Sequence, residues 1–213
     1  MIDKSPFTMV YKLIGEGKFD LAKFKKYIVS LPSKEYIKEH MENLIKQDCF
    51  IDTEYKYLLL QCASFGAKAI WIDENNKKWC TSSFRGYWLP TETSNRRSPV
   101  NPMMPMPDTL YERVKTLIDN LYGINSINDN INNIKIINKS IIYIDPPYDA
   151  TSKYGYEFDY MSFIEKYRNN NTIYLSEGKK LSDKAYLLSE GRTKGGINGD
   201  RNKKANEEWL SVF

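Results

Sequence analysis

The sequence has little histidine or cysteine: His40 is the single histidine, and there are three cysteines among 213 residues. One histidine excludes a site in which several histidines hold a metal, and the cysteine spacing matches no metal-binding template. An odd number of cysteines without such a template is typical of free thiols in a reducing compartment. The sequence also lacks a long apolar run and a hydrophobic N-terminal signal segment. We therefore expect a cytoplasmic protein without a membrane span.

Basic and aromatic residues are plentiful by comparison. The net charge is +4, and 16 residues are tyrosine. Residues 77–97 contain five basic side chains and one acidic one, and residues 179–204 contain eight basic and three acidic ones. Two basic stretches favour a polyanionic partner, although solvated surface charge explains them equally well when no motif is considered.

The first half of the chain has the periodicity of helices. Apolar residues recur at helical spacing in four segments, residues 7–14, 21–31, 36–45 and 53–64. Asp20 is placed to cap the second segment. Apolar runs on both sides of residues 73–76 predict a hairpin. A long proline-studded loop follows over residues 82–107, and another helix begins at Asp108.

The second half alternates short apolar strands with helical segments. We expect a helix over residues 158–167 and strands at residues 134–137, 141–144, 172–175, 186–188 and 207–213. This alternation predicts an α/β sheet. The run at residues 141–144 is apolar and mostly β-branched, which is typical of a buried strand. It ends at Asp145, because the two prolines that follow cannot donate to a sheet.

The sequence Asp145-Pro146-Pro147-Tyr148 at a strand end resembles motif IV of the amino-methylating DNA methyltransferases. The resemblance is closest to the adenine-specific, Dam-like group that is common in phages. Thr151, Tyr154 and Phe158-Asp159 follow in the order typical of that family. Further segments are similar to the segment that follows its second strand (residues 2–6 and 10–14), to the strand after the motif (residues 173–177) and to its C-terminal hairpin (residues 192–210).

The resemblance implies an α/β fold, an incomplete Rossmann-like methyltransferase sheet with a helical and hairpin target-recognition insertion. Residues 1–47 would form the N-terminal helical part of the core. Residues 48–107 would form the target-recognition region, and residues 108–213 the catalytic α/β part. The expected activity is S-adenosylmethionine-dependent methylation of the exocyclic amino group of adenine in DNA.

The motif suits that chemistry because the amino lone pair of adenine is delocalised into the ring. The Asp145 carboxylate and the Pro146 carbonyl can accept the two amino hydrogens, and Pro147 stiffens the backbone that presents them. Tyr148 offers a ring on which a base flipped out of the duplex can stack. The alternative is a structural strand tip, with Asp145 as a cap and Tyr148 as a packing residue.

Basic and aromatic residues elsewhere are candidates for DNA contact. The resemblance places Arg85, Arg96 and Arg97 in the target-recognition region, and arginines bind phosphates or read guanine edges. Lys153 and Tyr154 lie in the loop after the motif. Each arginine taken singly is also explained as surface charge.

One part of the family pattern does not occur in this sequence. The glycine-rich motif that wraps the methionine part of the methyl donor has no match, because neither Gly15-Glu16-Gly17 nor Gly195-Gly196 follows a strand and opens a helix. Asp3 and Asp145 are the candidate donor-binding residues. The chain is then completed by a second polypeptide, is a truncated and repacked enzyme, or is a non-catalytic module that binds nucleic acid or protein. Methylation of RNA or protein is a further possibility.

Overall fold

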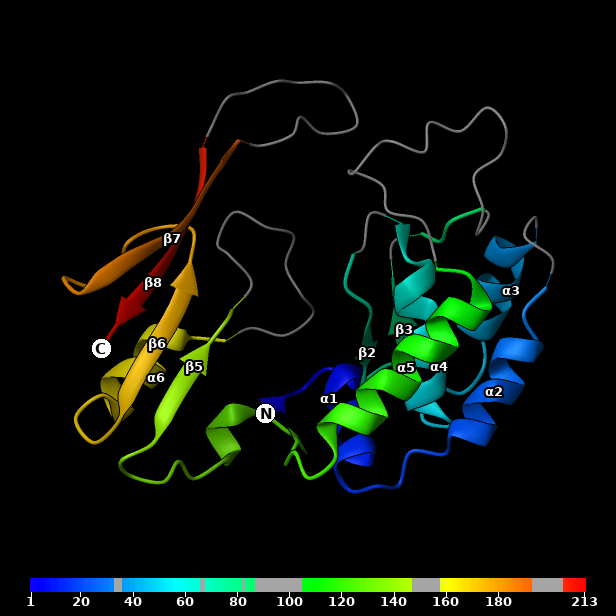
Figure 1. The fold of residues 1–213 in the computed structure, drawn as a ribbon, viewed down its shortest axis with the longest axis horizontal. Coiled ribbons are helices and arrows are strands. Elements are labelled where there is room, and N and C mark those ends of the chain that lie inside the picture. The colour runs from blue at the N-terminus through cyan, green and yellow to red at the C-terminus, as the bar shows by residue number, and fades with distance from the viewer. Residues whose placement is uncertain (33–35, 66–67, 82, 87–104, 147–157, 193–204) are drawn as a thin grey trace. The chain divides into compact units, whose positions relative to one another are not determined.

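The computed structural model divides into residues 1–133, called unit 1, and residues 134–213, called unit 2 (Figure 1). Together the two units give a mixed α/β protein. The structure describes residues 1–32, 36–65, 68–81, 83–86, 105–146, 158–192 and 205–213.

Unit 1 contains five helices in its described part: α1 (Pro6–Gly15), α2 (Leu21–Val29), α3 (Ile37–Leu44), α4 (Thr53–Ala63) and α5 (Pro107–Leu121). All five were expected from the periodicity of the sequence. The Asp20 carboxylate accepts a hydrogen bond from the Lys23 amide at 2.8 Å, which confirms the predicted N-cap of α2.

Helix α4 is at the centre of the unit 1 core. Its Leu59 and Leu60 side chains have no exposed surface, and they belong to one cluster with Phe24 of α2 and Met41 of α3. The buried positions of α4 lie on one broad face, and the other positions of the helix are partly buried, so that none of its residues is exposed. The helical part of the chain therefore has a continuous apolar interior.

Two short sheets complete unit 1. Strand β1 (Ile2–Asp3) pairs in parallel with β4 (Ile127–Asn128), and β2 (Trp71–Asp73) pairs antiparallel with β3 (Lys78–Cys80). The second pair confirms the predicted hairpin. A short 3₁₀ turn follows β4 at Ile131–Asn133. The strand expected at residues 134–137 is wrong, because the chain has no regular structure there and the strand lies earlier, at β4.

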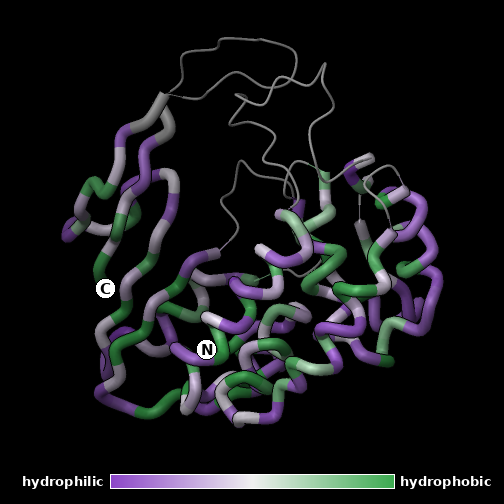
Figure 2. Tube along the Cα trace, turned by 45° about the vertical axis from the view of Figure 1, so that its right-hand side comes forward, coloured by the Kyte–Doolittle hydropathy of each residue, from purple (hydrophilic) through white to green (hydrophobic). Residues whose placement is uncertain are grey.

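Unit 2 is a four-stranded sheet in the order β5-β6-β8-β7, with one described helix. Its elements are β5 (Ile141–Ile144), α6 (Tyr160–Tyr167), β6 (Thr172–Glu177), β7 (Ala185–Arg192) and β8 (Ala205–Val212). Strand β5 runs parallel to β6, whereas β8 runs antiparallel to both β6 and β7 (Figure 1). Figure 2 shows hydrophobic residues at the labelled C-terminus, where β8 ends.

The sheet of unit 2 has one buried and one exposed apolar face at its β5 edge. Ile144, Ile173 and Leu175 are buried, as are Phe163 and Ile164 of α6, the helix that connects β5 to β6. On the other face Ile141 is 79% exposed and Tyr143 is 60% exposed. The expectation that residues 141–144 are buried throughout is therefore wrong for this face, because the burial of β5 alternates along the strand.

The two units divide the chain differently from the three expected parts. Helix α5 falls in the expected catalytic part, but it packs against α1 and α2 in unit 1. Helix α4 falls in the expected target-recognition region, but it forms the centre of the same core.

Candidate functional site

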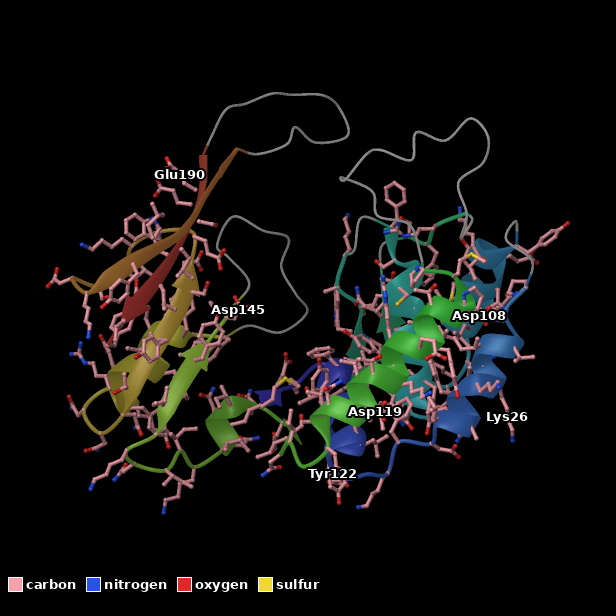
Figure 3. The ribbon with its side chains drawn as sticks, in the orientation of Figure 1. Lys26, Asp108, Asp119, Tyr122, Asp145 and Glu190 are labelled. Carbon is pink, nitrogen blue, oxygen red and sulfur yellow. The ribbon has the colours of Figure 1, made fainter. Side chains whose placement is uncertain are left out.

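Asp145 and Pro146 directly follow β5, at the edge of the unit 2 sheet where β6 also ends. Because Ile144 is the register partner of Leu175, Asp145 lies level with Ser176. Figure 3 shows Asp145 at the carboxyl end of β5. Asp145 as a whole residue is exposed although its carboxyl is partly desolvated, and Pro146 is buried. The Asp145 carboxylate is thus accessible at the end of a strand, next to a buried proline.

Three polar side chains of neighbouring strands share the sheet face of Asp145. The Ser176 hydroxyl donates a hydrogen bond to Glu208 Oε1 at 3.2 Å. The Ser189 hydroxyl donates to Glu208 Oε2 at 3.3 Å. Alternation along the strands and the pairing of β6, β8 and β7 put these three residues and Asp145 on one face. We call Asp145, Ser176, Ser189 and Glu208 the polar row.

The charge of the polar row changes the titration of its first member. Partial burial raises the pKa of Asp145 above its ordinary value, and the negative charge of Glu208 raises it further. A carboxylate with increased proton affinity at the end of a strand is a better acceptor for an N–H group than an isolated surface aspartate.

Glu177 is a second unusual carboxylate at the end of β6. The residue is 2% exposed, and its Oε1 accepts a hydrogen bond from the Gly178 amide at 2.7 Å. Its Oε2 is buried without a hydrogen-bond partner in the described part of the chain. By alternation Glu177 points to the face opposite the polar row. The described residues hold no group of three or more His, Cys, Asp or Glu side chains arranged to bind a metal ion.

The remaining predicted site residues are placed as follows. Asp3 ends β1 in unit 1, where its Oδ1 accepts a hydrogen bond from the Ser5 amide at 2.7 Å at the start of α1. Arg85 is 8% exposed, and its Nε donates to the Ser64 carbonyl at 3.2 Å. The rest lie outside the described residues, namely Pro147, Tyr148, Arg96, Arg97, Lys153 and Tyr154.

The described glycines do not form the loop that the expected methyl donor needs. Gly15 and Gly17 lie at the end of α1, and Gly123 follows α5. A Cβ atom on Gly15 would stand 1.9 Å from the Ile124 carbonyl oxygen, so this glycine allows a close backbone contact. Gly178 follows a strand, but it leads to another strand. Within the described residues, the chain does not fit S-adenosylmethionine through a glycine-rich loop.

Sequence reasoning found Asp145 and missed the rest of the polar row. Ser176 lies in the segment that resembles the strand after the motif. A single serine in a strand, however, does not indicate a functional role by its sequence pattern. Ser189 and Glu208 join the site through strand register, which depends on an irregularity between Leu187 and Ser189. One extra residue there moves the following side chains to the other face.

No protein-family model matches the sequence, and a search among curated proteins finds no significant match.

None of the helices in the described part of the chain is both long enough and apolar enough to cross a membrane.

Proposed function

We propose that this chain carries the amino-group site of an adenine-specific DNA methyltransferase. In this proposal unit 2 is the part of an incomplete Rossmann-like methyltransferase sheet that holds the target base. The observation that carries it is the position of Asp145-Pro146 at the carboxyl end of a strand in a parallel pair. Ligands of open α/β sheets bind at such strand ends.

The arrangement of the strands around β5 supports this assignment. The segment that resembles the family's next strand is β6, which lies parallel and adjacent to β5. The segment that resembles its C-terminal hairpin contributes to β7 and β8, and β8 pairs with β6. Three of the segments that resemble the family in sequence are thus neighbours in one sheet, which supports the proposal.

The chemistry of the proposed site follows from its acceptors. Asp145 accepts one hydrogen of the adenine amino group, and the Pro146 carbonyl accepts the other. Together the two acceptors increase the electron density on the amino nitrogen and fix its orientation. The Glu208 charge keeps the potential at Asp145 negative, which favours an N–H donor there. Tyr148 is the proposed stacking surface for the flipped base.

S-adenosylmethionine is the methyl donor implied by the resemblance, and it supplies an electrophilic methyl group when bound. Because the described residues do not fit its glycine-rich loop, we assign to this chain only the part of the reaction at the amino group. Asp3 of unit 1 and Asp145 of unit 2 each stay a proposed donor-binding residue, taken separately. A second polypeptide that completes the methyl-donor pocket is part of the proposal.

The β5 edge is the place where a second polypeptide would join. Strand β5 pairs only with β6 among the described strands. An edge strand with unused backbone groups and exposed apolar side chains is a template for another strand. Ile141 and Tyr143, both exposed, would then gain cross-strand neighbours on their face of the sheet.

DNA contacts are proposed for three arginines of unit 1 and, separately, for Lys153 and Tyr154 of unit 2. Arg96, Arg97, Lys153 and Tyr154 are the proposed backbone and base contacts. Arg85 is included, with its Nε already bonded to the Ser64 carbonyl. Contacts to phosphates would weaken as the salt concentration rises.

The proposal is tested first by base binding, because binding needs no donor. Two single-stranded oligonucleotides are compared by fluorescence anisotropy, one with adenine and one with purine that lacks the amino group. We expect the full chain to prefer adenine, and Asp145→Ala to lose the preference. Glu165→Gln removes an exposed charge on α6 and serves as the matched control. Equal affinity of the wild-type chain for both oligonucleotides would reject the amino-group site.

Methyl transfer is the second test. Adenine-containing DNA is incubated with radiolabelled donor and the full chain, with and without the polypeptide encoded directly upstream. Transfer that survives Asp145→Ala would reject the role of Asp145. Adenine binding without transfer, together with no heat of donor binding in calorimetry, would favour a methyltransferase-like binding module without catalysis. Transfer that RNA or a protein substrate suppresses more strongly than unlabelled DNA would show that the methyl acceptor is not DNA.

A further inference from the structure

Glu208 is a carboxylate whose two oxygens are both held by side chains of other strands. Ser176 of β6 donates to Oε1 at 3.2 Å, and Ser189 of β7 donates to Oε2 at 3.3 Å. Glu208 itself belongs to β8, which lies between these two strands. A side chain held from both sides cannot turn away without losing both hydrogen bonds. The sheet therefore fixes a negative charge at this position.

We propose that Glu208 is a positioning residue that acts through Asp145 to favour an amino-bearing base in the proposed site. This inference rests on the proposed function and adds a residue to it. Glu208 holds a fixed charge near the Asp145 carboxylate and does not itself touch the base.

The strand register supports this role. Ser176 is the register partner of Leu210, so Glu208, two residues earlier on β8, is its diagonal neighbour on the same face. Asp145 lies level with Ser176 on the adjacent strand. Ser176 thus stands between the two carboxylates, and its hydroxyl points to Glu208. One face of the sheet thus carries both acids, Asp145 directly after β5 and Glu208 on β8 beside the carboxyl end of β6.

The other acidic residues of the strands nearest to this end of the sheet do not share that face. They are Glu177 at the end of β6, Glu207 on β8 and Glu190 on β7. Lys179 lies beyond the end of β6, where strand alternation assigns it to neither face. Alternation directs Glu177, Glu190 and Glu207 to the opposite face. The Glu207 carboxylate accepts a hydrogen bond from Trp209 Nε1 at 2.7 Å on that side. Glu207 is therefore a matched control, one residue away with the same charge.

The fixed charge has a defined physical effect. A negative charge beside Asp145 disfavours its ionised form, and it raises the pKa of that carboxyl in addition to the effect of partial burial. The same potential attracts the positive end of an N–H bond. An amino group at Asp145 is then bound more tightly than a group without hydrogens to donate.

Carboxyl-detected NMR titration of the full chain tests the inference without any substrate. We expect Glu208→Gln, which keeps the size and the acceptor oxygen, to lower the titration midpoint of Asp145. We expect Glu207→Gln to leave it unchanged. Equal shifts in the two variants would show a general charge effect and would overturn the proposal, as would an unchanged midpoint in Glu208→Gln.

Oligonucleotide binding then tests the consequence for the base. The preference of the full chain for adenine over the amino-free purine should fall severalfold in Glu208→Gln and stay at the wild-type level in Glu207→Gln. Ser189→Ala, which removes one hydrogen bond to the carboxylate, should lie between them. A lowered Asp145 midpoint with an unchanged preference would reject the role of Glu208 in base binding. No preference in the wild-type chain would reject the proposed function itself, independently of the titration.

Discussion

In unit 1 helix α4 has no exposed residue, whereas in unit 2 strand β5 is exposed along one face. The difference extends to the acidic residues of the two units. Asp52 of unit 1 accepts hydrogen bonds from Lys23 Nζ at 2.5 Å and from the Tyr27 hydroxyl at 2.8 Å. Asp145 of unit 2 lies at an open strand end near a second acid. The first arrangement joins elements, and the second keeps an acceptor accessible.

For this reason the pKa values of the two aspartates are shifted in opposite directions. The Lys23 hydrogen bond, with help from Tyr27, lowers the pKa of Asp52. Partial burial and the Glu208 charge raise the pKa of Asp145. A residue whose ionised form is stabilised contributes to folding, while one whose ionised form is disfavoured is typical of sites where protons or N–H groups are handled. The comparison therefore separates a structural carboxylate from a candidate functional one.

The largest effect is expected in the unit 1 core. Phe24 has no exposed surface and packs against the Phe19 and Tyr55 rings. Phe24→Ala should lower the free energy of unfolding by about 3–5 kcal/mol, because it removes a buried ring and leaves a cavity. Far-UV circular dichroism during urea unfolding measures this mainly on unit 1, which contains most of the helices.

Val29→Ala on the same helix is the control for Phe24. Val29 is 75% exposed, so this change should stay within about 0.5 kcal/mol. A loss for Phe24→Ala that is no larger than the loss for the control would show that α2 does not depend on the described core.

A smaller but substantial effect is expected in the sheet of unit 2. Leu175 is fully buried, and Leu175→Ala should cost about 2–4 kcal/mol. Ile141, which is 79% exposed on the opposite face, should tolerate alanine within about 0.5 kcal/mol. Amide hydrogen exchange of residues 172–177 follows both variants. Similar losses of stability in Leu175→Ala and Ile141→Ala would mean that the exposed face of β5 is covered in solution.

The hydrogen bonds of Asp52 should contribute less than either core. Tyr27→Phe removes one donor to this carboxylate and should cost about 1–2 kcal/mol. The pKa of Asp52 is lowered in the folded chain, so its contribution is present above the unfolded pKa and is lost as pH falls through the folded one. Urea unfolding is measured at neutral pH and at a pH below the ordinary aspartate pKa. The loss of unfolding free energy caused by Tyr27→Phe should be smaller at the acidic pH than at neutral pH.

Asp52→Asn checks the sign of that pH effect. The variant should lose the part of the acid dependence that comes from this residue, whereas Asp48→Asn, on the same loop, should keep it. If the stability of Asp52→Asn depends on acid pH as strongly as that of the wild-type chain, the pH dependence comes from other carboxylates.

The helices and the helix cap of unit 1 were predictable from sequence, because they depend on neighbouring residues. Helical spacing located the five helices of unit 1, and the Asp20 cap followed from its place before α2. The residues of β4 were not predictable, because a two-residue strand has no period and is defined by pairing with β1, far away in the chain. Residues 134–137 are more apolar but have no partner strand in the described part of the chain.

The site was predictable to a similar extent. Proline cannot donate a backbone hydrogen bond to a sheet, so the position of Asp145 at the end of a strand followed from local chemistry. Glu208 and Ser189 did not follow, because an irregularity after Leu187 sets which residue of β7 faces Glu208. Uninterrupted pairing would place Leu188 opposite Glu208, and the carboxylate would lose a donor. Strand register, which is decided by tertiary packing, was the missing information.

The smallest effect on stability is expected for Asp145, the residue with the largest expected effect on base binding. Its folded pKa is raised, so the ionised carboxylate is disfavoured in the folded chain, and stability should increase as pH falls through this pKa. Asp145→Asn should therefore unfold at a urea concentration equal to or slightly above that of the wild-type chain at neutral pH, while adenine preference is lost. A clear destabilisation would show that Asp145 serves as a structural cap. Unchanged or increased stability with lost binding is the pattern of a residue kept for function at a cost to folding.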